Sequence, residues 1–183
     1  LSSFQSLFPR PHPTITGYEV SSPFDRLTAP AAKKSAATDR ITVIVTAFRP
    51  GSELVTAVRS LINQSWEDLE ILLVDDGSPP EFDAILHQCC ELDQRVRLIK
   101  LDANVGTYVA RNIGLDAAAG RFVTFQDSDD WSHPRRLERQ VEPLLHDASV
   151  VATISDGLRV TENLVITKPG RNPRVLNTSS LML

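Results

Sequence analysis

The sequence Leu69-Glu70-Ile71-Leu72-Leu73-Val74-Asp75-Asp76-Gly77-Ser78 is a short apolar run that ends in two aspartates, a glycine and a serine. Apolar runs of this length, bounded by turn-forming residues, are typical of strands. A strand that is apolar on both faces is expected in a parallel sheet covered by helices on its two sides. The stretch therefore predicts an inner strand of such a sheet, with its aspartates at the carboxyl end.

The same succession of strand and helix is found four times between residues 41 and 145. We expect strands over residues 41–45, 69–74, 96–101 and 121–126, followed by helices within residues 54–62, 82–89, 105–119 and 137–145. In the first helix, Leu54, Val58 and Leu61 recur at intervals of four and three residues, and Ser52 is suited to cap its start. Alternating strands and helices are joined by crossovers in a mostly parallel sheet, so the predicted fold class is α/β.

The two ends of the chain have different patterns. Residues 1–40 contain five of the twelve prolines, which predicts an extended arm or linker, or an irregular segment packed on the domain. After residue 150 the apolar runs become shorter. We expect short strands over residues 150–154, 158–160 and 164–167, with a turn near Asn163.

Composition excludes several classes of protein. The formal net charge of −4 argues against a protein whose main task is to hold a nucleic-acid backbone. No apolar run approaches the roughly 18 residues that span a bilayer. The only cysteines, Cys89 and Cys90, are adjacent and cannot staple a fold, which favours a reduced, cytoplasmic setting; a redox switch of the two thiols is the alternative.

Polar residues follow the predicted strands at their carboxyl ends, which is where open parallel sheets bind ligands. These positions hold Thr46, Ala47 and Phe48 after the first strand, Asp75 and Asp76 after the second, Asn104 and Gly106 after the third, and Asp127, Asp129 and Asp130 after the fourth. Five carboxylates on one rim require a cation or hydrogen-bond donors nearby. The rim is therefore the predicted site.

The spacing of Asp127 and Asp129 bears on a metal ion. Residues two apart in extended chain point to the same side, so these two carboxylates can converge on one ion. Carboxylate oxygens suit Mg²⁺ or Mn²⁺, and Mg²⁺ usually takes only one or two of them beside substrate phosphates and water. The alternative is purely structural, because aspartates often end strands and cap helices; Asp130 could cap the helix that Pro134 begins.

Five short motifs occur in order: Val45-Thr46-Ala47-Phe48-Arg49, residues 70–78, Asn104-Val105-Gly106, Ala110-Arg111-Asn112-Ile113-Gly114, and residues 120–130. Over residues 41–145 this ordered set closely resembles the family-2 inverting glycosyltransferases with the GT-A fold. The resemblance implies a Rossmann-like, three-layer sandwich around a mostly parallel sheet. It divides the chain into a Pro-rich arm over residues 1–40 and a nucleotide-sugar-binding domain over residues 41–183, in which the acceptor half is incomplete.

The resemblance also implies a nucleotide site. Thr46 and Phe48 match family positions that hold the base and the ribose, Phe48 by stacking. Asp76 matches the carboxylate that accepts a hydrogen bond from uracil, and the neighbouring Asp75 is expected to order the loop. Arg111 matches the arginine near the nucleotide and its diphosphate.

Asp127 and Asp129 match the family's metal-binding pair. Asp129 is the stronger candidate for direct ligation, and Asp127 is also expected to reach the ribose or the sugar. The ion implied is Mn²⁺ or Mg²⁺, which would neutralise charge on the leaving nucleoside diphosphate. Arg49 is a departure, because the family often has Asn there, and the change bears on the loop beside the phosphates.

The implied function is the transfer of a sugar, with inversion, from a nucleotide diphosphate donor such as a UDP-sugar to a saccharide, lipid-linked or other hydroxyl acceptor. No nucleic-acid partner and no transmembrane segment are expected, and the location is expected to be cytoplasmic or peripheral at the membrane. The family's catalytic base is an acidic residue well beyond the metal motif. Asp156 and Glu162 lie downstream, but in no matching segment, so we assign no base and expect it beyond Leu183.

Other interpretations remain open. One is a non-catalytic module that binds a nucleotide sugar through the same residues. Another is a receiver domain, because residues 71–76 resemble the acidic strand end of these phosphate-accepting domains; a preceding strand and helix, and the lack of any Lys between Asp130 and Lys168, disfavour it. A dinucleotide-binding dehydrogenase is disfavoured because no Gly-x-Gly-x-x-Gly follows the first strand.

Two features beside the acidic cluster have simpler explanations. His133 is more readily interpreted as a helix-start residue than as a metal ligand. Arg135, Arg136 and Arg139 form a basic run that we expect on a solvated helix face.

Overall fold

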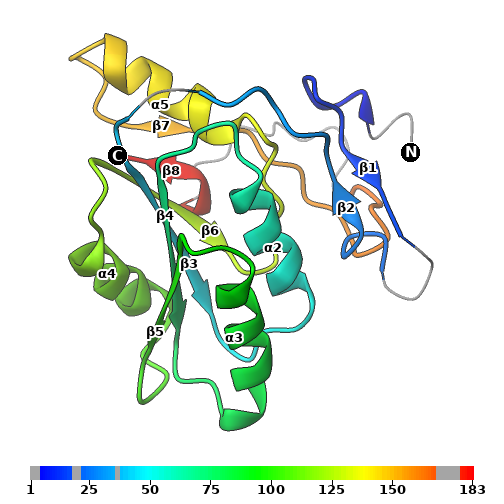
Figure 1. Cartoon of the computed structure of the whole chain (residues 1–183), viewed down its shortest axis with the longest axis vertical. Helices are drawn as coiled ribbons and strands as arrows, with labels where there is room; N and C mark the ends of the chain where they lie inside the picture. Colours follow the sequence, from blue (N-terminus) through cyan, green and yellow to red (C-terminus); the bar gives the residue numbers. More distant parts are fainter. Residues whose placement is uncertain (1–4, 18–21, 36–37, 168–177) are drawn as a thin grey trace.

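A six-stranded sheet forms the centre of the computed structural model, which describes residues 5–17, 22–35, 38–167 and 178–183 (Figure 1). The strands, in the spatial order β5-β4-β3-β6-β8-β7, are β3 Ile41–Ala47, β4 Leu69–Asp75, β5 Val96–Lys100, β6 Phe122–Asp127, β7 Thr153–Ile154 and β8 Leu181–Met182. Strands β3 to β6 are parallel, whereas β8 pairs antiparallel with β6 and β7. The predicted α/β fold with a mostly parallel sheet is therefore confirmed.

Helices cover both faces of this sheet and complete three layers (Figure 1). They are α2 Glu53–Ile62, α3 Asp83–Glu91, α4 Thr107–Ala117 and α5 Arg136–His146, with the 3-10 turns η1 Pro80–Phe82 and η2 Thr178–Ser180. Buried side chains of α2, α3 and α5 belong to one hydrophobic cluster, and those of α4 belong to another on the opposite face. The four strand and helix pairs expected from the sequence are all present.

Strand β3 shows why the helices separate into two groups. All seven of its residues are buried, and alternate side chains point to opposite faces. Val43 and Val45 join the cluster of α2, α3 and α5, whereas Ile44 packs toward α4. Helix α4 lies very close to the sheet here, because a Cβ atom added to Gly114 would lie only 2.6 Å from Ile44 Cγ2.

The start of α2 differs from the expectation for Ser52. Its side chain makes no capping hydrogen bond. Instead the Ser52 hydroxyl donates to Asp25 Oδ2 at 3.1 Å, and the Thr56 hydroxyl donates to the Asp25 carbonyl at 3.1 Å. Ser52 is thus the N-cap residue of α2, as expected, but its side chain does not cap the helix, because an N-terminal residue far away in sequence provides its partner.

The N-terminal part of the chain packs on the domain. It contains a short antiparallel pair, β1 Thr14–Ile15 and β2 Leu27–Thr28, which lies beside α2 (Figure 1). Further along, the Ser35 amide donates to the Ser65 carbonyl at 2.8 Å, and Trp66 Nε1 donates to the Asp39 carbonyl at 3.0 Å. These contacts fit the expectation of an irregular packed segment, whereas a domain boundary at residue 40 stays a prediction.

The chain after α5 forms the antiparallel edge of the sheet. Strand β7 falls within the predicted strand over residues 150–154, and a single antiparallel bridge joins Val160 to Ile166. Between them, the Leu164 amide donates to the Thr161 carbonyl at 2.8 Å, which closes the turn expected near Asn163.

Arg136 corrects the interpretation of the basic run as a solvated helix face. Its guanidinium group donates to six acceptors: Gln140 Oε1, Gln126 Oε1, Ser132 Oγ, Thr124 Oγ1 and the carbonyls of Phe125 and Ser179. Burial lowers the pKa of Arg136 to about 10, although the Asp130 charge acts in the opposite direction. The side chain therefore joins α5, β6 and η2 and is largely withdrawn from solvent, whereas Arg139 of the same run is exposed.

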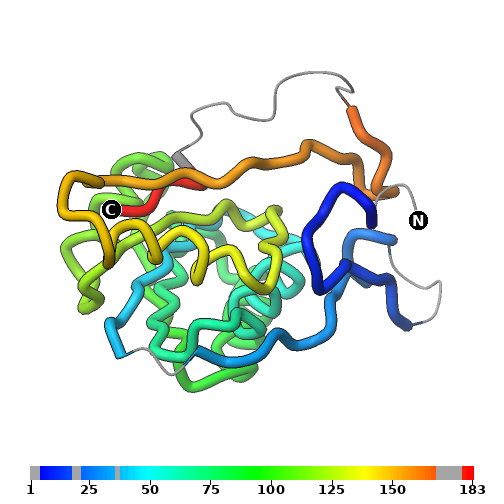
Figure 2. Tube along the Cα trace, turned by 90° about the horizontal axis from the view of Figure 1, so that it is seen from above, coloured from blue at the N-terminus to red at the C-terminus, as the bar shows by residue number. Residues whose placement is uncertain are grey.

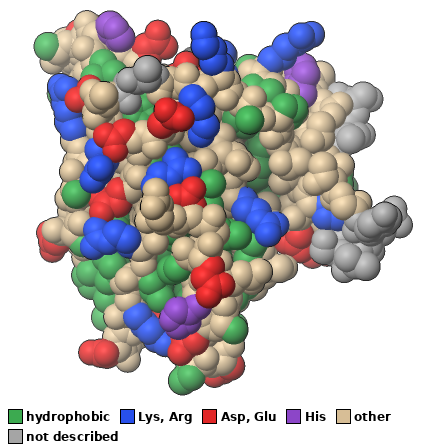
Figure 3. Space-filling model, viewed as in Figure 1, with side chains coloured by type: hydrophobic (Ala, Val, Ile, Leu, Met, Phe, Trp, Pro, Cys, Tyr) green, Lys and Arg blue, Asp and Glu red, His purple; other side chains and the backbone are tan. Residues whose placement is uncertain are grey.

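Charged side chains are distributed over the surface. On the face seen in Figure 3, basic and acidic groups are intermixed, and no single basic patch stands out. This distribution agrees with the formal net charge of −4. Within the described ranges, no helix has both the length and the apolar character needed to cross a bilayer.

Candidate functional site

The register of the parallel strands brings the predicted site residues together. Thr46 of β3 pairs with Asp127 of β6, and Ala47 pairs with Asp75 of β4. Asp76 follows directly, and its amide donates to the Ala47 carbonyl at 2.8 Å. Because the three inner strands end at one level, their polar ends face a common space, as in other open parallel sheets.

A cavity of about 180 Å³ opens at this point. It is lined by Thr46, Ala47, Phe48, Asp76, Thr107, Asp127 and Ser128. Four of the residues predicted to bind a nucleotide therefore share one cavity. The sequence pattern did not single out Thr107 or Ser128 as site residues. Thr107 directly follows the Asn-Val-Gly motif and Ser128 lies inside the Asp-Ser-Asp motif, and these positions were the available signals.

The turn after β4 is ordered by its own aspartates. The Ser78 amide donates to Asp75 Oδ1 at 3.2 Å. Asp76 accepts hydrogen bonds from two backbone amides, Val105 to Oδ1 at 2.7 Å and Gly106 to Oδ2 at 3.0 Å. Asp76 is 4% exposed, so its carboxylate both fixes the loop before α4 and forms part of the cavity wall.

Gly77 allows this turn to approach the same loop. Its φ is +73°, and an added Cβ atom would lie 2.4 Å from the Ala103 carbonyl carbon. Any larger residue would meet backbone there in addition to the cost of a left-handed conformation. Gly77 thus keeps the second strand end and the loop before α4 in contact.

Phe48 and Arg49 form an exposed edge of the cavity. Phe48 is 43% exposed, and the Arg49 guanidinium carbon lies 5.0 Å from the centre of its ring, within cation–π range. Arg49 has a φ of +50°, and its amide donates to Ser78 Oγ at 2.8 Å. Asn is enriched in this left-handed region, so an Asn would suit the backbone that Arg49 has here.

Arg111 is not a lining residue of the cavity, but it contacts Asp127, which is. Arg111 Nη2 donates to Asp127 Oδ1 at 2.6 Å. The guanidinium carbon also lies 5.8 Å from the ring centre of Tyr108 and 5.4 Å from that of Phe125. The Arg111 side chain is 8% exposed and that of Asp127 is 39% exposed, so the ion pair orients Asp127 and leaves part of it open to a ligand.

Asp129 and Asp130 follow Ser128 in the chain; both are exposed, and neither is among the residues that line the cavity. Partial withdrawal from water, followed by repulsion from Asp127 and Asp129, raises the pKa of Asp130 to about 6. The charges of Arg136 and Arg159 act in the opposite direction. Asp130 does not cap α5, because the residue at the cap position is Arg135 and its side chain makes no capping bond.

The residues present fit a divalent cation that is held jointly by protein and substrate. In the part of the chain that the structure describes, no three His, Cys, Asp or Glu side chains converge as a complete metal site. Two carboxylates, Asp127 and Asp129, are nevertheless the number that Mg²⁺ commonly takes from protein when phosphate oxygens complete its shell.

The remaining candidates lie elsewhere. His133 is no part of the cavity wall; its Nε2 atom lies 3.0 Å from the carbonyl oxygens of Pro9 and Pro11. Asp156 and Glu162 lie on exposed chain, and the Glu162 carbonyl accepts a hydrogen bond from the Phe24 amide. Neither acidic residue lines the cavity, so no base is assigned to them.

Comparison with known proteins places this arrangement in a family. The family model described as glycosyl transferase family 2 matches residues 42–174, and the chain belongs to that family. It is 35% identical over 111 residues to an uncharacterized glycosyltransferase of Haemophilus influenzae, a match that covers 61% of this chain and 44% of that protein. It is also 35% identical over 141 residues to the succinoglycan biosynthesis protein ExoO of Rhizobium meliloti, covering 77% of this chain and 38% of that protein.

A solved structure has the same architecture. The mannosyltransferase PcManGT from Pyrobaculum calidifontis, determined with GDP-Man and Mn²⁺, aligns with a TM-score of 0.60 at 23% identity, over 71% of this chain and 39% of that one. This likeness confirms the Rossmann-like, GT-A type of three-layer fold. The chain spans less than half the length of these relatives.

Proposed function

We propose that this chain is the donor-binding part of a glycosyltransferase that moves a sugar from a nucleoside diphosphate to an acceptor hydroxyl with inversion. The observation that carries the proposal is the cavity at the ends of β3, β4 and β6, which combines the exposed Phe48 ring, the buried Asp76 carboxylate and the partly open Asp127 carboxylate. Asp129 follows two residues later and is exposed. A nucleoside diphosphate sugar offers a matching series of groups: a flat base, a ribose, a doubly charged diphosphate and a polar sugar.

Each wall of the cavity suits one part of that donor. Phe48 offers an exposed ring on which a base can stack, beside Thr46 at the end of β3. Asp76 still has lone pairs after accepting two backbone amides, so it can accept a further N–H such as that of uracil. Arg111 brings positive charge near the diphosphate while it orients Asp127. A UDP-sugar is the proposed donor.

Asp129, with Asp127, is proposed to hold Mn²⁺ or Mg²⁺ against the diphosphate. When bound, the ion would neutralise charge that develops on the departing nucleoside diphosphate. The residues of this chain would then position the donor so that the face of the sugar opposite the diphosphate is open to the acceptor. The Pyrobaculum relative of the same fold holds a nucleotide sugar with Mn²⁺, which supports this combination.

Inverting transfer also requires a group that takes the acceptor proton, and we propose that it lies beyond Leu183. The acceptor is proposed to be a saccharide, a lipid-linked hydroxyl or another hydroxyl. Because both cysteines are free thiols, a cytoplasmic setting belongs to the same proposal. A module that binds the donor without transferring the sugar is the second candidate, because no catalytic base is assigned among the residues that line the cavity.

Thermal unfolding with added ligands tests the proposal. UDP, GDP and Mn²⁺ would be added singly and in nucleotide–metal pairs to the wild-type chain, to Asp129→Ala and to Asp116→Ala, an exposed control on the last turn of α4. Binding at about one hundred times Kd stabilises a protein by about 2.7 kcal/mol. We expect UDP to stabilise the wild type and the control more strongly with Mn²⁺, and Asp129→Ala to lose that metal-dependent part.

Three outcomes separate the candidates. If neither nucleotide changes the unfolding temperature with or without metal, both the enzyme and the binding module are contradicted. If GDP stabilises the protein and UDP does not, the assignment of uracil to Asp76 is wrong, but a nucleoside diphosphate sugar remains the proposed class of donor. Sustained sugar transfer from a panel of donors by this chain would exclude the module that only binds.

A further inference from the structure

The N-terminal residues 5–17, here called the strap, lie alongside the loop that follows β6. This loop, residues 128–135, carries Asp129 and is called the acidic loop. In Figure 2 the strap, in dark blue, runs next to the yellow-green acidic loop at the same end of the molecule. More than 110 residues of sequence separate the two segments, so only the tertiary structure brings them together.

Side chains of the acidic loop alternate between the strap and the core. In extended chain, Trp131 and His133 point one way and Ser132 points the other. On the outer side, Phe8 of the strap meets Trp131 edge-on with ring centres 6.0 Å apart, and it stacks on His133 at 6.3 Å with an angle of 6° between the rings. Such aromatic pairs contribute beyond the area they bury.

His133 is also hydrogen-bonded to the strap. Its Nε2 atom lies 3.0 Å from both the Pro9 and the Pro11 carbonyl oxygens, which can only accept, so Nε2 carries the proton. The Arg135 amide donates to Nδ1 at 3.2 Å, which completes a neutral tautomer. One side chain of the acidic loop thus holds two carbonyl groups of the strap at once.

The inner side of the acidic loop is bound to α2 and β6. The Ser132 amide donates to Ser60 Oγ at 3.0 Å, Gln126 Nε2 donates to the Asp130 carbonyl at 3.1 Å, and Gln64 Nε2 donates to the His133 carbonyl at 2.9 Å. The loop is therefore held from both sides immediately after Asp129, which is itself exposed.

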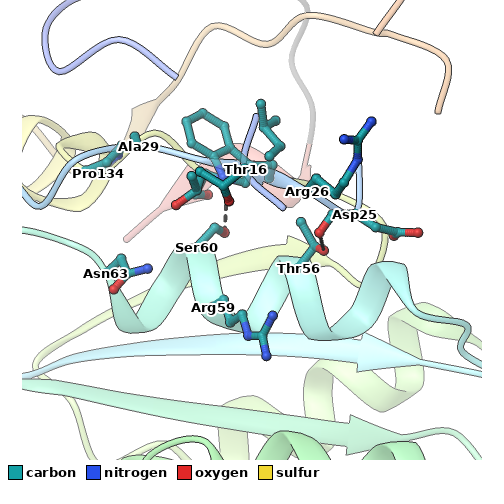
Figure 4. Close-up of a pocket in the computed structure, with 13 residues that line it drawn as sticks. Thr16, Asp25, Arg26, Ala29, Thr56, Arg59, Ser60, Asn63 and Pro134 are labelled. Atoms are coloured by element: carbon teal, nitrogen blue, oxygen red, sulfur yellow. Dashed lines mark hydrogen bonds between the residues drawn. The ribbon is translucent and has the colours of Figure 1, made fainter. Parts of the chain in front are cut away.

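Elsewhere the strap and the residues after it pack less tightly. A hollow of about 120 Å³ remains between this part of the chain, α2 and the acidic loop, bordered among others by Thr16, Asp25, Thr56 and Trp131 (Figure 4). In the same view Ser60 and Thr56 point up from α2 into hydrogen bonds, whereas Arg59 points away. The contacts of the strap with the acidic loop include those of Phe8, Pro9 and Pro11.

We propose that the strap is a positioning element for Asp129: by holding Trp131 and His133, it keeps the acidic loop in the geometry that receives the metal–diphosphate group. The inference rests on the proposed donor site. A loop released from the strap would have to be ordered by the ligand, and each side chain that is immobilised on binding weakens the affinity. Phe8, Trp131 and His133 are thus positioning residues and touch no substrate.

The test compares nucleotide affinity with and without metal in the full chain. The variants are Phe8→Ala and His133→Ala, with His133→Gln as the conservative variant and Leu7→Ala, a neighbouring exposed residue of the strap, as the matched control. The Gln amide N–H can replace the Nε2 donor, so it should restore the bond to the strap. Kd for UDP would be measured by calorimetry with Mn²⁺ and again with EDTA, well below each unfolding temperature.

We expect Phe8→Ala and His133→Ala to weaken binding of UDP with Mn²⁺ about tenfold, and to leave binding in EDTA unchanged. His133→Gln and Leu7→Ala should bind as the wild type does. If the two alanine variants only unfold at lower temperature and keep the wild-type Kd with Mn²⁺, the strap is merely structural and the inference is overturned. Absence of metal-dependent binding in the wild type would contradict the proposed function itself, which is a distinguishable result.

Discussion

Both ends of the parallel sheet carry carboxylates. At one end the carboxylate is surrounded by hydrogen-bond donors, and at the other end the carboxylates stay partly open. At the amino end, Glu70 of β4 is 6% exposed and is surrounded by donors. The Thr42 hydroxyl donates to Oε2 at 2.8 Å, the Ala119 amide donates to Oε2 at 2.9 Å, and Arg97 pairs with Oε1. This carboxylate is satisfied within the protein, and it joins the chain entering β6 to the bottom of the sheet.

At the carboxyl end the acidic residues are only partly satisfied. Asp76 is bound to two amides and Asp127 to one arginine, whereas Asp129 is exposed and Asp130 has its pKa raised to about 6 by partial burial and its acidic neighbours. This difference shows that the burial of a carboxylate does not by itself indicate a functional site. A carboxylate that stays partly open beside a cavity, as Asp127 does, is the more informative observation.

We expect the largest effect on stability, with little effect on nucleotide binding, when Glu70 is replaced. In Glu70→Ala, the Thr42 hydroxyl and the Ala119 amide lose their acceptor inside the protein, so we expect a loss of about 3 kcal/mol in unfolding free energy. Nucleotide binding should hardly change, because Glu70 lies at the other end of β4. Urea unfolding and calorimetric titration with UDP and Mn²⁺ would measure the two effects.

Glu67→Ala is the matched control, since Glu67 is exposed and lies three residues away. It should cost less than about 0.5 kcal/mol. If Glu70→Ala abolished nucleotide binding in folded protein, the two ends of the sheet would be coupled, and the contrast drawn between them would fail.

A smaller and opposite effect is expected for Asp76→Ala. The amides of Val105 and Gly106 lie in an exposed loop, so water can replace the carboxylate and the loss of stability should be only about 1 kcal/mol. Affinity for UDP should fall at least about tenfold, because the cavity loses its base-facing acceptor. Asp102→Ala, an exposed aspartate close by, should leave both quantities unchanged, and equal affinities for the two variants would remove Asp76 from the nucleotide site.

The smallest expected effect is the part of the pH dependence of stability that comes from Glu70. Burial acts to raise the pKa of Glu70, but the hydrogen bonds from Ala119, Thr42 and Arg97 outweigh it and the net shift is downward. The unfolded chain therefore takes up this proton at higher pH than the folded chain, so the stabilisation is complete above the ordinary glutamate pKa and is lost as pH falls through the folded value.

Wild type should accordingly lose more stability than Glu70→Gln between about pH 5 and pH 3, where ordinary and lowered glutamate pKa values fall. The variant lacks only this titrating group, so other carboxylates cancel in the comparison. Urea unfolding at several pH values would measure the difference. If the unfolding free energies of the wild type and of Glu70→Gln changed with pH in the same way, the donors around Glu70 would not favour its charged form.

Much of the fold could be predicted because its signals are local. Residues 41–47 and 69–75 are mostly apolar and are buried throughout, and mostly apolar runs of this length specify strands covered on both faces. The positions of Thr46, Asp76 and Asp127 followed once the strands were known to be parallel, since parallel strands end on one side. The roles of these side chains toward a donor stay predictions.

Other features could not be predicted because their partners are distant in sequence. Arg136 belongs to a run of basic residues that resembles a solvated face, yet six acceptors from three parts of the chain enclose it. Ser52 occupies a cap position, yet its hydroxyl bonds to Asp25. Periodicity and spacing describe neighbours along the chain, and neither describes such contacts.

By itself the sequence determined the order of strands and helices, the parallel sheet and the rim on which the acidic residues gather, because hydrophobic periodicity acts within each segment. Only the tertiary structure decided which carboxylates are neutralised and which remain open, and that the strap holds His133 beside the acidic loop. The physical reason is that burial and hydrogen bonding depend on groups brought together across the fold, whose identity no local pattern contains.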